Sequence, residues 1–238
     1  MHEHPLVSAI ILNYRSPQDA LQCARALLSQ EGIPSIEVLL TNNYSEDDSI
    51  GIFHATFQSE PRVRIIETAK NLGFGGGNNY AARYVKGEYL LIINPDNVLP
   101  KDGIARMLHQ LQSDETIGII GPALVHPDDS IRPSARAFPT IVDLLKKRIF
   151  PSLWEESFAK EQTIQMLAMH DVDWMVGACL FLRRELFVSL KGFDERFFLF
   201  FEDIDLCRRC WEQSKRVVYM PEIRALDKKQ RLSGKNIF

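Results

Sequence analysis

Short apolar runs alternate with amphipathic stretches along the first half of the chain. Apolar runs too short for a helix are typical of strands buried on both faces of a sheet. Apolar residues spaced three and four positions apart, as they are between these runs, predict helices. The expected strands are residues 7–12, 36–40, 63–66 and 89–93, and the expected helices begin after residues 16, 49 and 77. This alternation predicts a parallel, doubly wound α/β sheet with right-handed crossovers.

The alternation weakens in the second half of the chain. Residues 100–121 still fit a helix and a strand, but residues 122–171 show no clear period. Order resumes at residues 172–182, and residues 197–201 form an apolar run that delivers carboxylates to the start of a helix. The length fits one domain over residues 1–238 whose second half is elaborated.

The composition is that of an ordinary globular protein: 45% of the 238 residues are hydrophobic, 25% are charged and the net charge is −3. No apolar run approaches the ~18 residues needed to span a membrane, and the amino terminus lacks the basic and apolar regions of a signal peptide. We therefore expect a cytoplasmic protein that does not bind nucleic acid nonspecifically. Cys207 and Cys210 lack a second pair with which to complete a zinc site, so we expect buried free thiols.

The strand at residues 89–93 ends in a polar segment that suits a divalent cation. Pro95 cannot donate a hydrogen bond to a neighbouring strand, so the strand stops there. Asp96 then stands at the carboxyl end of a buried parallel strand, where open α/β sheets bind their ligands. With Asn94 and Asn97 beside it, Asp96 offers the oxygen ligands that Mg²⁺ or Mn²⁺ prefers. A tight turn with a solvated Asp is the alternative.

A glycine-rich segment, Gly73 to Gly77, precedes this strand. Glycines let the backbone approach a ligand closely, and a helix that begins there would favour an anion at its N-terminus. By itself such a segment is more typical of a tight turn. The polar strand end at Asn94, Pro95 and Asp96 is what favours a binding site.

Two segments near the middle of the chain resemble the family 2 glycosyltransferases, especially their rhamnosyltransferase-like branch. They are Asn71-x-Gly73-Phe74-Gly75-Gly76-Gly77-Asn78-Asn79 and Asn94-Pro95-Asp96. The resemblance implies a GT-A fold and a nucleotide-sugar donor, with dTDP-rhamnose favoured by this branch. It also implies that Asp96 holds a divalent cation, Mg²⁺ or Mn²⁺, which bridges the donor diphosphate. Residues 1–121 would then bind the nucleotide-sugar, and residues 122–238 would hold the acceptor and the catalytic base.

By the same resemblance, the loops after the first two strands hold the base and ribose of the donor. Asn13 and Arg15 belong to the first loop, and Asn42 and Asn43 to the second. The family usually has Asp where this chain has Asn42, and Asn still accepts and donates hydrogen bonds, so the departure concerns base preference. Asn42 and Asn43 fit an Asx-type turn equally well. The remaining donor-binding residues implied are Asn71, Gly75 and Asn94.

Three segments of the second half resemble the same family in the same order. They are Trp174-x-x-Gly177-Ala178-Cys179, Gly192-Phe193-Asp194-Glu195-Arg196-Phe197-Phe198 and Phe201-Glu202-Asp203-x-Asp205-Leu206. The resemblance implies that Asp203 is the general base, that Glu202 supports it, and that Trp174, Gly177 and Ala178 line the acceptor site. The alternative for Glu202 and Asp205 is structural, because acidic residues in a first helical turn gain ~0.3–1 kcal/mol each from the helix dipole.

The expected reaction needs two carboxylates with different tasks. In an inverting transfer, one base takes the proton of an acceptor hydroxyl while that oxygen attacks the anomeric carbon. A metal ion stabilises the diphosphate leaving group without a proton donor. Asp203 and Asp96, from separate parts of the chain, meet these two needs. The expected acceptor is a polysaccharide or a lipid-linked glycan, and the sequence does not indicate an oligomeric state.

Two further segments carry open alternatives. Asp227 stands where the resembled branch commonly has a metal-binding His; it is either a second metal ligand, which suits Mg²⁺ or Mn²⁺, or a solvated residue paired with Lys228 or Lys229. Residues 141–154 are apolar and basic together. They form either a peripheral contact with the membrane interface or a helix that packs on the body with its cations solvated.

Other classes of protein also stay open at this point. A non-catalytic nucleotide-sugar-binding subunit would keep the fold without turnover. A sugar-nucleotide nucleotidyltransferase has a related sheet, but it needs a glycine-rich loop with arginine directly after the first strand, and Leu12-Asn13-Tyr14-Arg15 contains no glycine. A glycosidase is disfavoured because its pair of carboxylates would leave the nucleotide-binding half unexplained.

Overall fold

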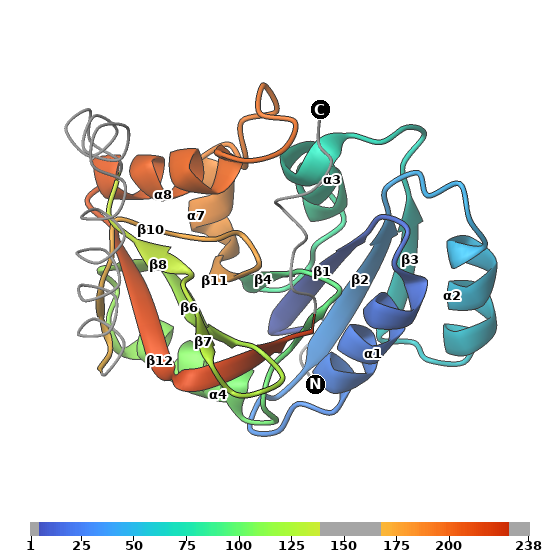
Figure 1. Ribbon diagram of the computed structural model, residues 1–238, viewed down its shortest axis with the longest axis horizontal. Coiled ribbons are helices and arrows are strands. Elements are labelled where there is room, and N and C mark those ends of the chain that lie inside the picture. The colour runs from blue at the N-terminus through green and yellow to red at the C-terminus, as the bar shows by residue number, and fades with distance from the viewer. Residues whose placement is uncertain (1–4, 139–167, 229–238) are drawn as a thin grey trace.

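The structure, a computed structural model, describes residues 5–138 and 168–228, and a ten-stranded mixed sheet runs through this part of the chain (Figure 1). The main path of the sheet follows the order β3-β2-β1-β4-β11-β6-β12-β5, with β7 added beside β6 and β9 beside β12. A separate pair is formed by β8 and β10. The strand order places β3, β2, β1 and β4 at one end, and the strands of the second half beyond them, with the short β5 at the far edge.

The first half forms the predicted parallel sheet. Its strands are β1 (Val7–Asn13), β2 (Ile36–Asn42), β3 (Val63–Glu67) and β4 (Tyr89–Ile93). In register, Val7 lies opposite Ile36 on one side and Tyr89 on the other, so the carboxyl ends of β1, β2 and β4 meet at one edge. All residues of β1, β2 and β4 are buried, as expected for strands covered on both faces. The expected alternation of strand and helix is therefore confirmed.

The second half joins this sheet through an antiparallel strand. β11 (Cys179–Arg183) pairs antiparallel with both β4 and β6 (Ile117–Val125). β12 (Arg216–Asp227) runs parallel to β6 and ends antiparallel to β5 (Asn97–Val98). The remaining short strands are β7 (Ile131–Arg132), β8 (Ala135–Arg136), β9 (His170–Asp171) and β10 (Trp174–Met175). The fold is thus a mixed sheet with a parallel nucleus.

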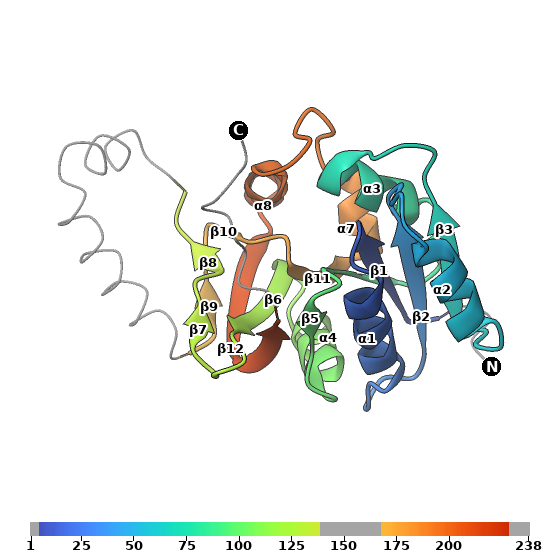
Figure 2. The same cartoon turned by 45° about the vertical axis from the view of Figure 1, so that its right-hand side comes forward.

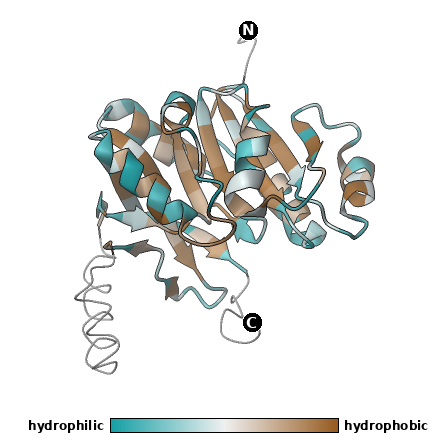
Figure 3. Ribbon diagram, turned by 90° about the horizontal axis from the view of Figure 1, so that it is seen from above, coloured by the Kyte–Doolittle hydropathy of each residue, from teal (hydrophilic) through white to brown (hydrophobic). Residues whose placement is uncertain are grey.

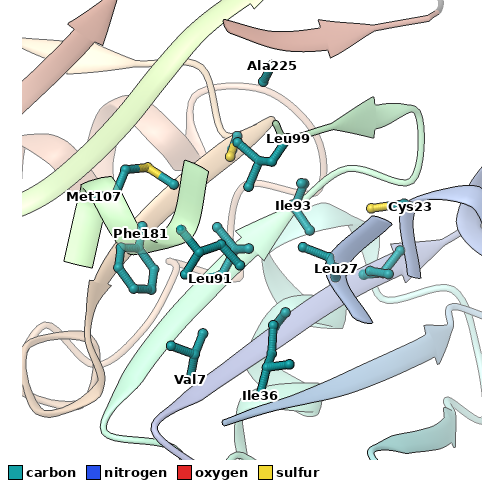
Figure 4. Close-up of a cluster of buried hydrophobic side chains, with 14 of the residues drawn as sticks. Val7, Cys23, Leu27, Ile36, Leu91, Ile93, Leu99, Met107, Phe181 and Ala225 are labelled. Carbon is teal, nitrogen blue, oxygen red and sulfur yellow. The ribbon is translucent and has the colours of Figure 1, made fainter. Parts of the chain in front are cut away.

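Helices cover both faces of the sheet (Figures 1 and 2). One apolar cluster joins one face to α1 (Pro17–Leu28), α2 (Ser49–Phe57) and α4 (Gly103–Ser113), and Figure 4 shows Cys23, Leu27, Leu91 and Met107 within it. A second cluster joins the opposite face to α3 (Gly73–Ala82), α7 (Arg184–Ser189) and α8 (Glu202–Glu212). Seen from above, apolar strands lie between helices whose outer faces are polar (Figure 3). The edge at which β1, β2 and β4 end lies between these two layers.

The glycine-rich segment departs from the prediction. We expected Gly73 to Gly77 to form a turn before a helix, but these residues are the first half of α3 itself. Close packing explains the glycines: a Cβ at Gly77 would lie 2.7 Å from a methyl carbon of Leu12, and a Cβ at Gly73 would lie 2.1 Å from the carbonyl oxygen of Phe198. Tertiary contacts therefore override the poor helix propensity of glycine at this position.

Two remaining expectations have clear outcomes. All four cysteines are buried free thiols, as predicted. Within residues 5–138 and 168–228, no helix has the length and apolar character to cross a membrane. The segment 141–154, for which we weighed a membrane contact, lies outside the described residues, as does Lys229.

Candidate functional site

The loops after β1 and β2 are tied together by buried amides. Asn13 and Asn42 are opposite each other in the strand register and are both fully buried. The Asn13 side-chain amide donates to Asn42 Oδ1 at 3.1 Å and to the hydroxyl of Ser49 at 3.1 Å. The Asn42 amide nitrogen has no hydrogen-bond partner among the described residues, and a buried donor of this kind is costly unless a partner binds it. Asn13 thus shapes the loops, and Asn42 keeps an unused donor.

Asn43 and Asn71 fix the start of α3. The Asn43 side-chain amide donates to Asn71 Oδ1 and to the carbonyl of Gly73, both at 3.0 Å. Asn43 Oδ1 accepts from the backbone N–H of Leu72 at 3.0 Å, and Asn71 Oδ1 accepts from that of Gly73 at 2.9 Å. The second-strand loop therefore holds the amino end of this helix against the carboxyl edge of the sheet. Asn43 takes part in this network instead of a self-contained Asx turn.

The strand end after β4 presents a carboxylate at the same edge. The backbone N–H of Asn97 donates to the carbonyl of Asn94 at 3.1 Å, which closes the turn around Pro95. Asp96 is half-buried and accepts a hydrogen bond from the Asn97 side chain at 3.1 Å. Asn97 Oδ1 is buried and has no hydrogen-bond partner among the described residues. The turn therefore offers one carboxylate and one unsatisfied amide oxygen.

Asp227 lies beside this turn, although it is 131 positions further along the chain. In the pairing of β12 with β5, Asp227 is opposite Asn97, and the backbone N–H of Lys228 donates to the carbonyl of Asp96 at 3.0 Å. The Asp227 side chain is fully buried and forms an ion pair with Arg132, which comes from β7. One alternative was a solvated Asp227 paired with Lys228 or Lys229. The solvation in that alternative is wrong, because β12 extends to Asp227 and buries it.

The donor atoms at this edge fit a hard divalent cation. Asp96, Asp227 and Asn97 contribute only oxygen atoms, which Mg²⁺ and Mn²⁺ prefer. Among the described residues, no three His, Cys, Asp or Glu side chains gather as a metal site. These cations commonly take one or two protein carboxylates and complete their shell with substrate phosphates and water, and Asp96 with Asp227 matches that pattern.

Asp203 lies in the first turn of α8 and is held by two backbone donors. Its Oδ2 accepts from the N–H of Gly177 and its Oδ1 from the N–H of Ile204, both at 2.9 Å. Asp203 as a whole is half-buried. Asp205, one position beyond Ile204, pairs with Arg209 at 2.6 Å. The two acidic residues therefore differ: Asp205 stabilises its own helix, whereas Asp203 connects the helix to the sheet.

A short backbone bridge joins Asp203 to the Asp96 turn. Gly177 donates to Asp203, and the next residue, Ala178, accepts from the backbone N–H of Asn94 at 2.8 Å. Both residues of the bridge are buried. The dipeptide Gly177-Ala178 therefore holds the first turn of α8 on one side and the polar strand end of β4 on the other. This brings together the two carboxylates that the sequence assigned to different tasks.

The surroundings of Asp203 include residues from α3 and from the β8–β10 pair. Glu202 is buried, and a Cβ built at Gly75 would lie 3.7 Å from its Cβ. Trp174 is buried, donates its indole N–H to the carbonyl of Ala137 at 3.0 Å, and carries the guanidinium of Arg136 over its ring at 5.5 Å. Glu202, next to Asp203 in the chain, is therefore packed against α3, and Trp174 is held by the segment that contains β8.

Sequence analysis gave Arg136 no role in the site. Burial lowers the pKa of Arg136, and the charge of Asp203 works against that shift, so the two groups are electrostatic neighbours. The signal available in the sequence was an arginine, one of two between residues 126 and 138 in the otherwise irregular stretch after β6. Its cross-strand pairing with Trp174 becomes visible only once β8 and β10 are placed together.

One predicted donor residue lies further out. Arg15 has its side chain largely exposed, pairs with Glu46 at 2.6 Å, and stacks on the neighbouring Tyr14 ring at 5.2 Å. Its backbone N–H donates to Ser45, which belongs to the second-strand loop. Arg15 therefore stands at the rim of the edge. Gly75 lies inside α3, where a Cβ would meet Phe193 at 2.9 Å and Glu202 at 3.7 Å, so it packs against the second half of the chain.

Comparisons with known proteins identify the family. Residues 8–190 match the sequence profile of Glycosyl transferase family 2. The N-acetylglucosaminyl-diphospho-decaprenol L-rhamnosyltransferase of Mycobacterium tuberculosis is 30% identical over 235 residues, which covers 93% of this chain and 76% of that protein. Rhamnosyltransferase WbbL of Escherichia coli K12 is 28% identical over 65% of this chain and 60% of its own length. The chain belongs to the family 2 glycosyltransferases and is similar to their rhamnosyltransferase members.

Solved structures confirm the GT-A fold. A mannosyltransferase from Pyrobaculum calidifontis, solved with GDP-Man and Mn²⁺, has a TM-score of 0.70 at 17% identity and is matched by 97% of this chain over 59% of its own length. TarS of S. aureus, solved with UDP-GlcNAc, has a TM-score of 0.66 at 16% identity and is matched by 98% of this chain over 61% of its length. Identities this low establish the fold alone.

Proposed function

We propose that this chain is an inverting, metal-dependent glycosyltransferase that moves rhamnose from dTDP-rhamnose to a hydroxyl of a lipid-linked glycan. The observation that carries the proposal is the bridge through Gly177 and Ala178, which links Asp203 to the Asp96 turn. The similarity to the mycobacterial rhamnosyltransferase, whose name specifies a diphospho-decaprenol acceptor, supports the donor and the acceptor class. In this account, the reaction takes place at the cytoplasmic face of a membrane.

In the proposed reaction, Asp203 acts as the general base. The acceptor oxygen attacks the anomeric carbon, the bond from that carbon to the diphosphate oxygen breaks, and the acceptor proton passes to Asp203. Attack from the face opposite the diphosphate inverts the anomeric configuration. The hydrogen bonds from Gly177 and Ile204 hold the carboxylate in one orientation, and Glu202 supports the base from the same helical turn. Positioned bases of this kind contribute ~10²–10⁴-fold in rate.

The metal and donor would occupy the carboxyl edge of the sheet. Asp96 and Asp227 would hold the cation, whose contribution is to offset the charge that develops on the diphosphate. Arg132 offsets part of the negative charge of Asp227 before any cation binds. We assign the contacts with the base and ribose to Arg15, at the rim, and to Asn42, whose buried amide nitrogen has no partner among the described residues. We assign Trp174, with Gly177 and Ala178, to the acceptor side.

The proposal is tested by incubating the chain with Mn²⁺ and dTDP-rhamnose, UDP-GlcNAc or GDP-mannose in separate reactions. A glycosyl-diphospho-isoprenoid serves as the acceptor, and the product is identified by mass spectrometry. We expect transfer from dTDP-rhamnose, with NMR showing a product anomer opposite to that of the donor. Donor binding with neither transfer nor hydrolysis above background would instead identify a non-catalytic binding subunit. Transfer with retained configuration would exclude the inverting mechanism.

A further inference from the structure

Four consecutive apolar residues stand exposed directly before the helix that carries Asp203. Phe198, Leu199, Phe200 and Phe201 have between 44% and 60% of their surface exposed. The other exposed large hydrophobic residues that the structure describes are scattered singly over different elements: Tyr14, Tyr44, Tyr84, Met169 and Val188. Single exposed apolar residues are normal, whereas a contiguous group marks a contact surface.

The backbone holds this loop in place. The carbonyl of Phe198 accepts from the N–H of Phe74 in α3 at 3.0 Å, and Gly73 approaches the same carbonyl more closely than any Cβ would permit. Phe200 and Phe201 have φ angles of 69° and 71°, a left-handed conformation that bulky residues rarely adopt. The loop that exposes these side chains is therefore fixed to α3, in a backbone conformation that its residues do not favour.

The loop also lies next to the proposed base. Figure 1 shows it as an arch between the amino ends of α8 and α3. Phe200 is three residues before Asp203, at most about 11 Å of chain. When the acceptor hydroxyl lies at Asp203, the part of the acceptor beyond its sugar is therefore within reach of these side chains.

The charges around the loop disfavour an anionic surface as the partner of its exposed side chains. Residues 194–205 contain five acidic side chains and one basic side chain, Arg196, while 197–201 contain none. An anionic membrane surface or a nucleic acid is attracted by clusters of Lys and Arg, and here the surrounding charge has the opposite sign. A hydrocarbon chain gains from apolar contact and is indifferent to this charge.

We infer that Phe198, Leu199, Phe200 and Phe201 form the binding surface for the isoprenoid chain of the acceptor, which lies across the loop while the acceptor hydroxyl is at Asp203. This inference rests on the proposed function, because it takes the lipid-linked acceptor from there. It adds a specificity for chain length that resides in exposed apolar side chains.

The test uses two glycosyl diphosphates with the same sugar, one carrying a long isoprenoid chain and one a single isoprene unit. The double variant F198S/L199S removes two apolar side chains and leaves the carbonyl contact with Phe74 in place. Val188→Ser is the matched control, since Val188 is also exposed but lies on α7 beside Tyr89, at the opposite end of β4 from the site. Circular dichroism and donor affinity confirm that each variant is folded.

We expect F198S/L199S to raise the KM for the long-chain acceptor about tenfold, as expected for losing the partial burial of two apolar side chains. The KM for the short-chain acceptor and the affinity for donor should stay unchanged, and Val188→Ser should match the wild type in every assay. Equal effects on both acceptors, or no effect on either, would overturn the inference.

A binding assay separates this inference from the proposed function. The long-chain isoprenyl diphosphate is titrated in neutral detergent micelles, a measurement that needs no turnover. Weaker binding by F198S/L199S than by Val188→Ser supports the inferred binding surface, even if no acceptor is glycosylated in the transfer assay. A failure of glycosylation would count against the proposed function alone. Equal binding overturns it. Binding to anionic phospholipid vesicles that lack isoprenoid is measured as well. If the wild type binds these vesicles and the double variant does not, the loop contacts the membrane surface, and the inference is overturned.

Discussion

The backbone N–H of Gly177 donates a 2.9 Å hydrogen bond to Oδ2 of Asp203, and the next residue in the chain accepts one from Asn94. Gly177 thereby places the carboxylate of α8 beside the polar end of β4. A side chain at this position would be crowded, because a Cβ at Gly177 would lie 3.0 Å from the ring of Phe74 and 3.4 Å from the Cβ of Asp203. The geometry of the site therefore depends on the backbone of the second half as well as on its acidic residues.

The assignment of the metal to the Asp96 turn predicts a specific loss. Asp96→Ala should abolish the stimulation of donor binding by Mn²⁺, because the carboxylate that holds the cation is gone. Asp102→Ala is the control, since Asp102 precedes α4 and has a largely exposed side chain near Arg106. Isothermal titration of dTDP-rhamnose with and without Mn²⁺ measures the effect. An Asp96→Ala protein whose donor affinity still rises with Mn²⁺ as in the wild type would contradict the assignment.

The buried pair of Asp227 and Arg132 predicts a loss of stability when either charge is removed alone. Arg132→Gln should lower the free energy of unfolding by about 3–5 kcal/mol, because it leaves the fully buried charge of Asp227 uncompensated. Asp227→Ala should cost less, because the Arg132 side chain is partly exposed. The double variant should recover much of that loss. Denaturant unfolding of the four proteins measures it, and additive losses in the double variant would show that the two side chains are not coupled.

The same variants separate stability from metal binding. If Asp227 is a cation ligand, Asp227→Ala raises the Mn²⁺ concentration needed for half-maximal donor binding, and Asp227→His restores it. Arg132→Gln breaks the ion pair but leaves the carboxylate, so it should not weaken the response to Mn²⁺. An unchanged Mn²⁺ titration in Asp227→Ala would leave Asp96, diphosphate and water as the ligands.

The close approach of α3 to β1 predicts different outcomes at adjacent glycines. Gly77→Ala should destabilise the protein and weaken donor binding, because the new Cβ meets both methyl carbons of Leu12 within 3 Å and Asn43 at 3.3 Å. At Gly76 a Cβ comes no closer than 3.1 Å, to Leu72, and the gain in helix propensity, up to ~1 kcal/mol, offsets the contact. Thermal unfolding and donor titration compare the two variants, and equal behaviour would be inconsistent with this packing.

Burial predicts that the thiols of the native protein are unreactive. Burial raises the pKa of Cys23, Cys179 and Cys207, and it raises the pKa of Cys210 to about 12. Because a raised pKa keeps each group as the neutral thiol at pH 8, and the thiolate is the nucleophile, iodoacetamide should modify none of them before unfolding. All four should react in guanidinium chloride. Rapid native labelling of any one of them, detected by mass spectrometry, would place that thiol in an accessible environment.

Local patterns predicted the first half of the fold and the position of Asp96 well. The strand at residues 89–93 is apolar throughout and ends at a proline, so its end and the carboxylate after it follow from the sequence alone. The helical state of Gly73 to Gly77 did not follow, because contacts with Leu12 and Phe198 decide it. Such contacts join residues far apart in the chain, and no local period records them.

Long-range pairing also explains what the sequence left open in the second half. Asp227 meets Arg132 and the Asp96 turn only because β12 lies between β6 and β5. Arg136 meets Trp174 across a strand pair of two residues each, too short to leave a recognisable pattern. The motifs around Gly177 and Asp203 did indicate a site, but the bridge from one carboxylate to the other is made by backbone groups, which every residue carries.

The most direct test of the account is the rate of glycosyl transfer by Asp203→Asn, measured with donor affinity in the same preparation. Asparagine keeps the size of the side chain but cannot take the acceptor proton, so transfer should fall ~10²–10⁴-fold while the dissociation constant for the donor stays nearly unchanged. Asp205→Asn, two positions further along the helix at a residue that pairs with Arg209, should retain transfer. Wild-type transfer by Asp203→Asn would contradict the assignment of the base and would make Glu202 the candidate.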